Sequence, residues 1–169
     1  MSTEKLYLAP SKIAGTGVFA KENIEVGAHI LAFEGRLISL EEAIAKGGRE
    51  SDALQIEPQW YMDLIAPGVL VNHSCKPNAG IINDRNLFAI SPIAAGEELS
   101  YDYSTTMDEE SWHHPCTCGN PDCRGVISDF KTLPLEVQAR YLSMGIVQEF
   151  IARKCRSALG GLNLQNLSL

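Results

Sequence analysis

The sequence predicts a mainly β domain followed by a helical C-terminal appendage. Residues 6–103 contain short apolar runs separated by Gly, Pro and Asn, which is typical of strands joined by tight turns. Residues 104–125 are polar and rich in cysteine. After Leu133-Pro134 the apolar residues recur three or four positions apart, which indicates amphipathic helices. A chain of 169 residues fits one domain with a short addition.

Strands and a hairpin are expected in the first part of the chain. Strand candidates are residues 18–19, 30–33, 54–56, 61–64, 80–82 and 87–90. The last two candidates flank Asn83-Asp84-Arg85-Asn86, whose turn-forming residues predict a hairpin.

Helices are expected at three places. Ser39 and Glu42 form a capping-box pattern, so a short helix is expected over residues 40–45, ending near Gly47-Gly48. Two further apolar sets follow, separated by Gly145: Leu135, Val137, Tyr141 and Leu142, then Ile146, Val147, Phe150 and Ile151. Residues 159–169 are expected to form a frayed end.

The composition excludes some classes of function. The formal net charge of −7 argues against direct nucleic acid binding, because phosphates are bound by Lys and Arg. An acidic surface suits a Lys-rich partner, although acidity more often serves solubility. No apolar run approaches the ~20 residues of a membrane span, and residues 1–10 contain no apolar signal core. We therefore expect an intracellular protein without a membrane segment.

Three of the five cysteines predict a metal site. Cys116, Cys118 and Cys123 form a C-x-C-x4-C pattern within eight residues. A structural zinc ion needs four ligands, so one must come from elsewhere in the chain. Cys75 is the favoured fourth ligand, with His113 and His114 as rivals. Cys155 has apolar neighbours and is expected to be a packed free thiol. An iron–sulfur cluster is a weaker alternative, since nothing nearby indicates redox chemistry.

Two polar segments suggest ligand binding. Gly15-Thr16-Gly17 allows close approach of the backbone to a ligand, although a plain β-turn is the more usual explanation of such a segment. Asn72-His73-Ser74-Cys75 is hard to explain as core, and the Asn72 amide suits a zwitterionic amino-acid group. His73 is either a general base or, more in keeping with such positions, a structural histidine.

Tyr101 and Tyr103 end a predicted strand. Residues two apart in a strand point to the same face, so the two rings are expected side by side. They form either an ordinary aromatic pair or a narrow aromatic slot with phenol hydroxyls at its base.

Taken in order, these segments resemble the SET family of protein-lysine methyltransferases. The resemblance covers residues 6–125. It rests on Gly15-Thr16-Gly17, Phe33-Glu34-Gly35, Asn72-His73-Ser74-Cys75, Pro77-Asn78, Gly96-Glu97-Glu98-Leu99, Tyr101-Asp102-Tyr103 and the post-SET cysteine pattern.

The resemblance implies a SET fold of small β-sheets, with the Asn72 segment in a pseudoknot and a post-SET zinc knuckle. It divides the chain into a SET domain (1–104), a post-SET zinc-binding segment (105–126) and the helical appendage (127–169).

The resemblance also implies the cofactor, S-adenosylmethionine, and the roles of individual residues. Tyr103 would be catalytic, and a tyrosine at position 101 would limit the product to monomethyl-lysine. The implied cofactor-binding residues are Gly15, Thr16, Gly17, Val18, Asn72 and His73. The implied ligands of a structural zinc ion are Cys75, Cys116, Cys118 and Cys123.

Substrate and assembly stay open at this stage. Gly68-Val69-Leu70-Val71 replaces the Arg-Phe that usually precedes the family's asparagine, and there is no cysteine-rich pre-SET region. A Lys-rich protein such as a histone is the expected substrate, and the chain is expected to be a monomer or a homodimer. The alternatives are a catalytically silent SET module that binds proteins, or a zinc-knuckle interaction domain.

Overall fold

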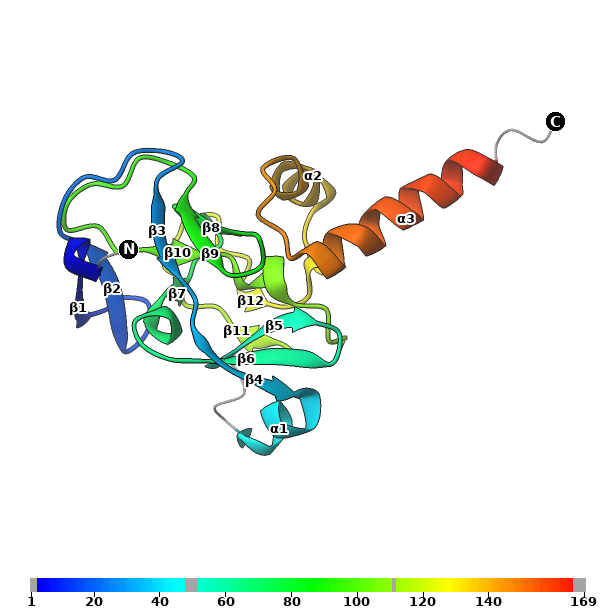
Figure 1. Ribbon diagram of the computed structural model, residues 1–169. Helices are drawn as coiled ribbons and strands as arrows, with labels where there is room; N and C mark the ends of the chain where they lie inside the picture. The colour runs from blue at the N-terminus through cyan, green and yellow to red at the C-terminus, as the bar shows by residue number, and fades with distance from the viewer. Residues whose placement is uncertain (1–2, 48–51, 111, 166–169) are drawn as a thin grey trace.

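The body of the molecule is built from small β-sheets, as the turn-punctuated sequence predicted (Figure 1). The computed structural model describes residues 3–47, 52–110 and 112–165. In these parts of the chain, β1 (Leu6–Pro10) pairs with β2 (Thr16–Ala20), and β9 (Asn86–Ala89) lies between β3 (His29–Ala32) and β8 (Ala79–Ile82). The third sheet places β6 (Trp60–Leu64) between β4 (Gly35–Ser39) and β5 (Ala53–Glu57).

Two further pairings involve short strands. β11 (His114–Pro115) pairs with β12 (Val126–Ile127) in the cysteine-rich segment. β7 (Asn72–His73) pairs in parallel with β10 (Ser100–Tyr101), and Ser74 N–H donates to Tyr101 O at 3.1 Å. This pairing brings the Asn-His segment beside the tyrosine segment, although about thirty residues separate them.

The predicted hairpin and the predicted short helix are both confirmed. β8 and β9 pair in antiparallel register around the turn, where Asn83 and Asp84 adopt positive φ angles of 52° and 63°. Asn and Asp tolerate such angles, and the connection between the paired residues Ile82 and Asn86 is three residues long. Helix α1 (Leu40–Ala45) begins with the predicted capping box between Ser39 and Glu42. Lys46 caps its end, and Gly48 lies outside the described residues.

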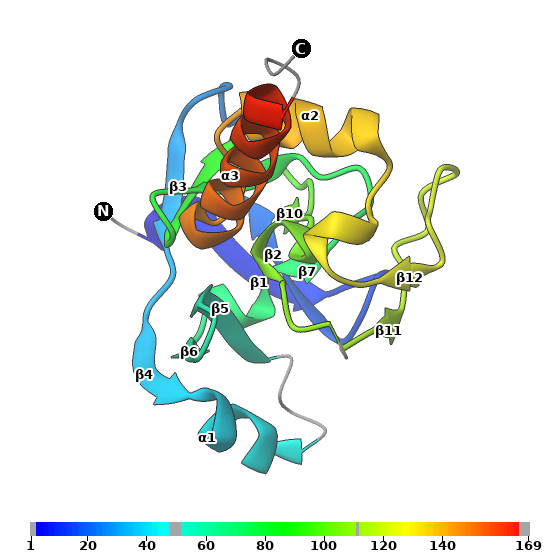
Figure 2. The same cartoon turned by 90° about the vertical axis from the view of Figure 1, so that its right-hand side faces the viewer.

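The helices predicted as a C-terminal appendage are present and pack against the β body. Helix α2 (Leu135–Ser143) and helix α3 (Glu149–Gln165) enclose a second apolar core beside the main one, and Gly145 between them has a φ of +67°. A Cβ atom added at Gly80 on β8 would lie 2.6 Å from Ile146 Cγ2, so glycine is needed for this close contact. Figure 1 and Figure 2 both show these two helices on the side of the body opposite α1.

Two expectations about the chain ends and strands are corrected. The frayed end predicted from residue 159 is wrong for residues 159–165, because α3 continues to Gln165; residues 166–169 lie outside the described part. The strand before Tyr103 ends at Tyr101, and Tyr103 begins the 3-10 helix η4 (Tyr103–Thr106), whose start is capped by the Asp102 carboxylate.

Among the described residues, no helix is both long and apolar enough to span a membrane.

Ile146→Ala tests whether the helices and the β body unfold as one unit. Ile146 is 1% exposed, and its truncation should destabilise the fold by about 2–4 kcal/mol through lost burial and a residual cavity. Leu135, which is 82% exposed, is the matched control, and Leu135→Ala should change stability by less than about 0.5 kcal/mol. Urea unfolding is followed by tryptophan fluorescence, which reports on the β body. The midpoint of this transition should move to a lower urea concentration for Ile146→Ala. An unchanged fluorescence midpoint would mean that the helices unfold independently.

Candidate active site and metal centre

The two tyrosines predicted to lie side by side do meet in the structure. The ring centroids of Tyr101 and Tyr103 are 4.8 Å apart, although only Tyr101 lies in a strand. Tyr103 Oη donates to Val71 O at 2.9 Å, which fixes the direction of its ring. The Tyr101 hydroxyl has no hydrogen-bond partner within the described residues, so it can bond to a guest molecule.

Burial keeps both phenols neutral. It raises the pKa of Tyr101 and Tyr103 well above the ordinary value of 10, and neighbouring negative groups act in the same direction. At physiological pH each tyrosine therefore offers a hydroxyl and an aromatic face, and neither can act as a general base.

His73 connects the tyrosine segment to the cysteine cluster. Tyr103 N–H donates to His73 Nδ1 at 3.1 Å, so the ring proton must be on Nε2, which lies 3.4 Å from Cys75 Sγ. Burial lowers the pKa of His73 to about 4, so the imidazole is neutral at pH 7. Its two nitrogens are thus both engaged, which favours the structural reading of this histidine over the general base.

Asn72 is held with its carbonyl oxygen free for a ligand. Its Nδ2 donates to Ala14 O at 3.1 Å and to Glu98 Oε1 at 2.8 Å, and both of these atoms can only accept. Glu98 also accepts from Ser11 Oγ at 2.9 Å. No basic side chain of the described chain forms an ion pair with Glu98. The site therefore presents an acceptor, Asn72 Oδ1, near an uncompensated carboxylate, which suits a ligand that carries an ammonium group.

Two pockets share Tyr103 and Trp112. The narrower one, here called the tyrosine pocket, has a volume of about 50 Å³ and is also lined by Leu40, Ile44, Tyr61 and Tyr101. The wider one, here called the asparagine pocket, has a volume of about 260 Å³ and is also lined by Ala14, Asn72, His73 and Thr117. One pocket is sized for a slender chain and the other for a small molecule, and one tyrosine ring contributes to both.

The predicted glycine segment lies at the edge of the asparagine pocket. Ala14 lines the pocket, whereas Gly15, Thr16, Gly17 and Val18 are not among its lining residues. Val18 is fully buried in the main core, and a Cβ atom at Gly17 would lie 2.3 Å from Glu98 Oε1. A side chain at position 17 would therefore displace the carboxylate that holds Asn72. Backbone contact of residues 15–18 with a cofactor stays a prediction.

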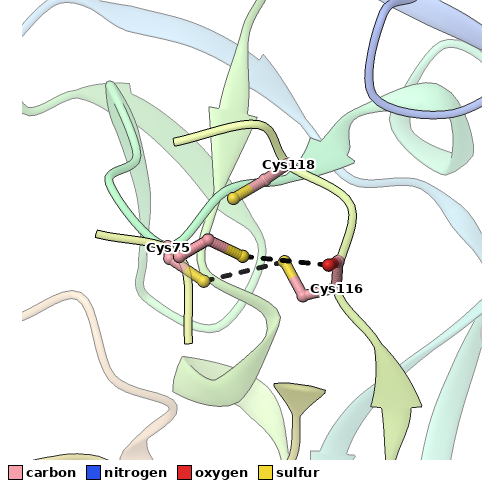
Figure 3. A group of neighbouring side chains, drawn as sticks. Cys75, Cys116 and Cys118 are labelled. Atoms are coloured by element: carbon pink, nitrogen blue, oxygen red, sulfur yellow. Dashed lines mark hydrogen bonds between the residues drawn. The ribbon is translucent and has the colours of Figure 1, made fainter. Parts of the chain in front are cut away.

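The four cysteines predicted as zinc ligands come together. Figure 3 shows three of them, Cys75, Cys116 and Cys118, with their sulfur atoms turned toward one another. The sulfur atoms of Cys75, Cys116, Cys118 and Cys123 all lie within 4.8 Å of one another, and Cys75 Sγ is 3.7 Å from Cys116 Sγ. A tetrahedron with Zn–S bonds of ~2.3 Å has edges of about 3.8 Å, so the donors fit a zinc ion with no open position. Such an ion would hold the knuckle against the Asn-His segment and would not activate water.

The thiol environment also agrees with a cation site. Burial raises the pKa of the Cys75 and Cys116 thiols, which is unfavourable for thiolates without a cation. Burial opposes ionisation of Cys118 too, but the N–H groups of Cys75 and Asn120 lower its pKa to about 7 overall. A divalent cation offsets the cost of gathering several thiolates in one place.

The rival ligands lie outside this cluster. His113 and His114 are exposed, and His114 belongs to β11. Cys155 lies on α3 and packs against the second apolar core, as expected for a free thiol. Among the described residues, the four-cysteine group is the one that offers a closed set of soft ligands.

Sequence reasoning missed three residues of the site. Glu98 was noted only as part of a motif, and Trp112 and Arg124 were not considered as site residues. Trp112 lies in an irregular segment and stacks on His114 at 6.1 Å between centroids, so no periodicity pointed to it. Arg124 directly follows Cys123, the last cysteine of the C-x-C-x4-C pattern. This adjacency was the one feature of the sequence that pointed to Arg124.

The geometry defines a class of β domain in which two unequal pockets share a tyrosine and a four-cysteine cluster adjoins the wider pocket. Residues 15–104, slightly more than half of the chain, match the family model described as SET domain. The chain therefore belongs to the SET domain family, as its motifs indicated.

Relatives of this chain are histone methyltransferases by name. The histone-lysine N-methyltransferase trr of Drosophila melanogaster is 37% identical over 135 residues, which cover 70% of this chain and 6% of that protein. A Schizosaccharomyces pombe histone-lysine N-methyltransferase, H3 lysine-4 specific, is 32% identical over 142 residues, covering 74% of this chain and 15% of that protein. The chain thus spans only a small part of these relatives.

A solved structure supports the same fold. A humanized mutant of the Chaetomium thermophilum Polycomb Repressive Complex 2, bound to the inhibitor GSK126, superposes with a TM-score of 0.52 at 27% identity. The match covers 60% of this chain and 15% of that chain. The SET fold predicted from the motifs is confirmed.

Cys75→Ser tests the assignment of the fourth zinc ligand. We expect zinc binding to weaken by roughly 100-fold or more, because a hydroxyl is a far poorer ligand than a thiolate. Cys155→Ser is the matched control and should bind zinc like the wild type. Competition with a chromophoric chelator measures both affinities. If Cys75→Ser and wild type bound zinc with equal affinity, the fourth zinc ligand would have to be a residue other than Cys75.

Proposed function

We propose that the chain is a protein-lysine methyltransferase, which transfers a methyl group from S-adenosylmethionine to the side-chain amine of a lysine in a protein substrate. The observation that carries the proposal is the pair of unequal pockets that share Tyr103. The tyrosine pocket fits the unbranched side chain of lysine, and the asparagine pocket fits the methyl donor. The names of the relatives support the same chemistry.

The residues of the asparagine pocket fit the proposed cofactor. Asn72 Oδ1 can accept from the ammonium of its amino-acid group, and the nearby Glu98 carboxylate favours positive charge. S-adenosylmethionine, when bound, supplies a methyl group activated by a sulfonium. Trp112 and Tyr103, which line both pockets, would exclude water from the meeting point.

The protein's main contribution would be alignment of the two reactants. Holding them in line can supply ~7–11 kcal/mol of the barrier reduction. A lysine with an ordinary pKa of ~10.4 must lose a proton, which costs about 5 kcal/mol at pH 7. Desolvation in the tyrosine pocket and the positive charge of the cofactor both lower this pKa. The neutral tyrosines cannot take the proton, so it would leave through water.

We further propose that the product is monomethyl-lysine. The Tyr101 hydroxyl lies in the narrow pocket and has no partner within the described chain, so it is free to bond to the lysine nitrogen or to a water beside it. Either bond takes up space that a second methyl group would need.

The substrate is proposed to be a Lys-rich basic protein of the histone type. The net charge of −7 favours a basic partner, and the relatives carry histone in their names. The unpaired thiols of the cluster suit a reducing compartment, so we propose that the chain acts inside the cell.

The proposed activity is tested by mass spectrometry of histones, histone-like proteins and cell lysate after incubation with labelled S-adenosylmethionine. We expect label on lysine, and roughly 100-fold less with Tyr103→Phe because an aligned hydroxyl is lost. Since the phenols titrate well above pH 10, Tyr103→Phe should lower the rate without shifting its pH profile between pH 7 and 9. Cofactor binding without transfer to any protein would instead favour the silent binding module.

Tyr101→Phe tests the proposed degree of methylation. Removing the hydroxyl should enlarge the space around the amine, so dimethyl-lysine and trimethyl-lysine should appear among the products. Tyr61→Phe, in the same pocket wall, is the control and should leave the product distribution unchanged. Intact-mass measurement of one peptide substrate over time gives the proportions of monomethyl-, dimethyl- and trimethyl-lysine. A wild-type enzyme that already produces trimethyl-lysine would contradict the monomethylation proposal.

A further inference from the structure

A buried carboxylate lies between the two tyrosines in the sequence. The Asp102 side chain is 0% exposed, and it accepts hydrogen bonds from three segments of the chain. Ser104 N–H donates at 3.1 Å, Tyr141 Oη donates at 3.2 Å, and the Arg124 guanidinium donates twice, at 2.8 Å to each oxygen. Asp102 thus joins η4, helix α2 and the cysteine knuckle at one point.

Arg124 is the knuckle residue of this group. It follows the zinc-ligand candidate Cys123, and its own N–H donates to Cys75 Sγ at 3.4 Å. The same segment contributes His114, Pro115, Thr117, Cys118 and Ile127 to the wall of the asparagine pocket. Any movement of the knuckle relative to Asp102 would therefore change the pocket wall and the tyrosines together.

His73 does not compete for this carboxylate as a cation. Its Nδ1 lies 3.6 Å from Asp102 Oδ1, but that nitrogen already accepts from Tyr103 N–H and carries no proton. Arg124 is thus the positive partner of Asp102 in the described structure. A two-bond arginine–carboxylate pair fixes both distance and orientation, which a lysine cannot reproduce.

We propose that Arg124 and Asp102 form a positioning pair. The pair holds the cysteine knuckle, the segment from Cys116 to Arg124, at a fixed position relative to Tyr101 and Tyr103. The inference rests on the proposed methyl transfer as far as its kinetic consequences are concerned. Neither residue is among those that line the tyrosine pocket or the asparagine pocket. Arg124 acts by holding Asp102, and Asp102 acts through the start of η4, where its carboxylate caps the helix that begins at Tyr103.

Arg124→Lys is the decisive variant, because it keeps the charge and loses the paired geometry. Arg153→Lys is the matched control: Arg153 binds Glu57 through 3.1 and 3.2 Å contacts, but that pair is exposed on the surface. Each variant is compared with wild type for zinc content, for kcat and KM of cofactor and peptide, and for hydrogen exchange at the Tyr103 and Ser104 amides.

We expect Arg124→Lys to retain its zinc and to lose roughly 10-fold or more in kcat, with a raised KM for the cofactor. Exchange at the Tyr103 and Ser104 amides should accelerate by about 10-fold or more, because Ser104 N–H donates to Asp102 and Tyr103 begins the helix that this carboxylate caps. Arg153→Lys should match wild type in every readout. Tyr141→Phe, which removes only the third partner, should shift the same two amides by a smaller factor.

Two results would overturn the pairing proposal. One is an Arg124→Lys protein that keeps zinc and has wild-type kinetics and amide exchange. The other is loss of zinc, which would make Arg124 a residue for metal retention. If wild type transfers no methyl group but Arg124→Lys still accelerates exchange at both amides, the methyl-transfer proposal fails while the pairing stands.

Discussion

The parallel pairing of β7 with β10 is the contact on which the candidate site depends. It is only two residues long, yet it places Asn72 opposite Ser100 and His73 opposite Tyr101. The asparagine, the tyrosines and the first cysteine of the cluster are thereby brought within one small region. A parallel pair cannot be closed by a tight turn, and here the connection between the two strands contains β8 and β9.

The polar groups of the site mainly hold one another in place. Glu98 and Ala14 orient the Asn72 amide, while His73 bonds to the Tyr103 backbone and faces a cysteine sulfur. Buried polar groups of this kind are costly unless they are paired, and pairing makes their geometry specific. Such a site is suited to a reaction whose main requirement is alignment, because it has neutral phenols and a neutral imidazole.

The C-terminal helices belong to the same structural unit as the site. Gln148 Nε2 donates to Gln55 O and Asp84 O, and the backbone N–H of Gln148 donates to Thr105 O in η4. Tyr141 reaches the carboxylate between the tyrosines. The helical appendage thus contacts η4 and the carboxylate between the two tyrosines.

The sequence by itself determined the local structure: the capping box at Ser39, the Asn83-Asp84 hairpin and the cysteine spacing each depend on neighbours a few residues away. It also indicated the family through an ordered set of short motifs. Only the tertiary structure decided that Cys75 completes the sulfur cluster, that Glu98 orients Asn72 and that Trp112 lines both pockets. These contacts join segments far apart in the chain, and no local periodicity or propensity encodes such distances.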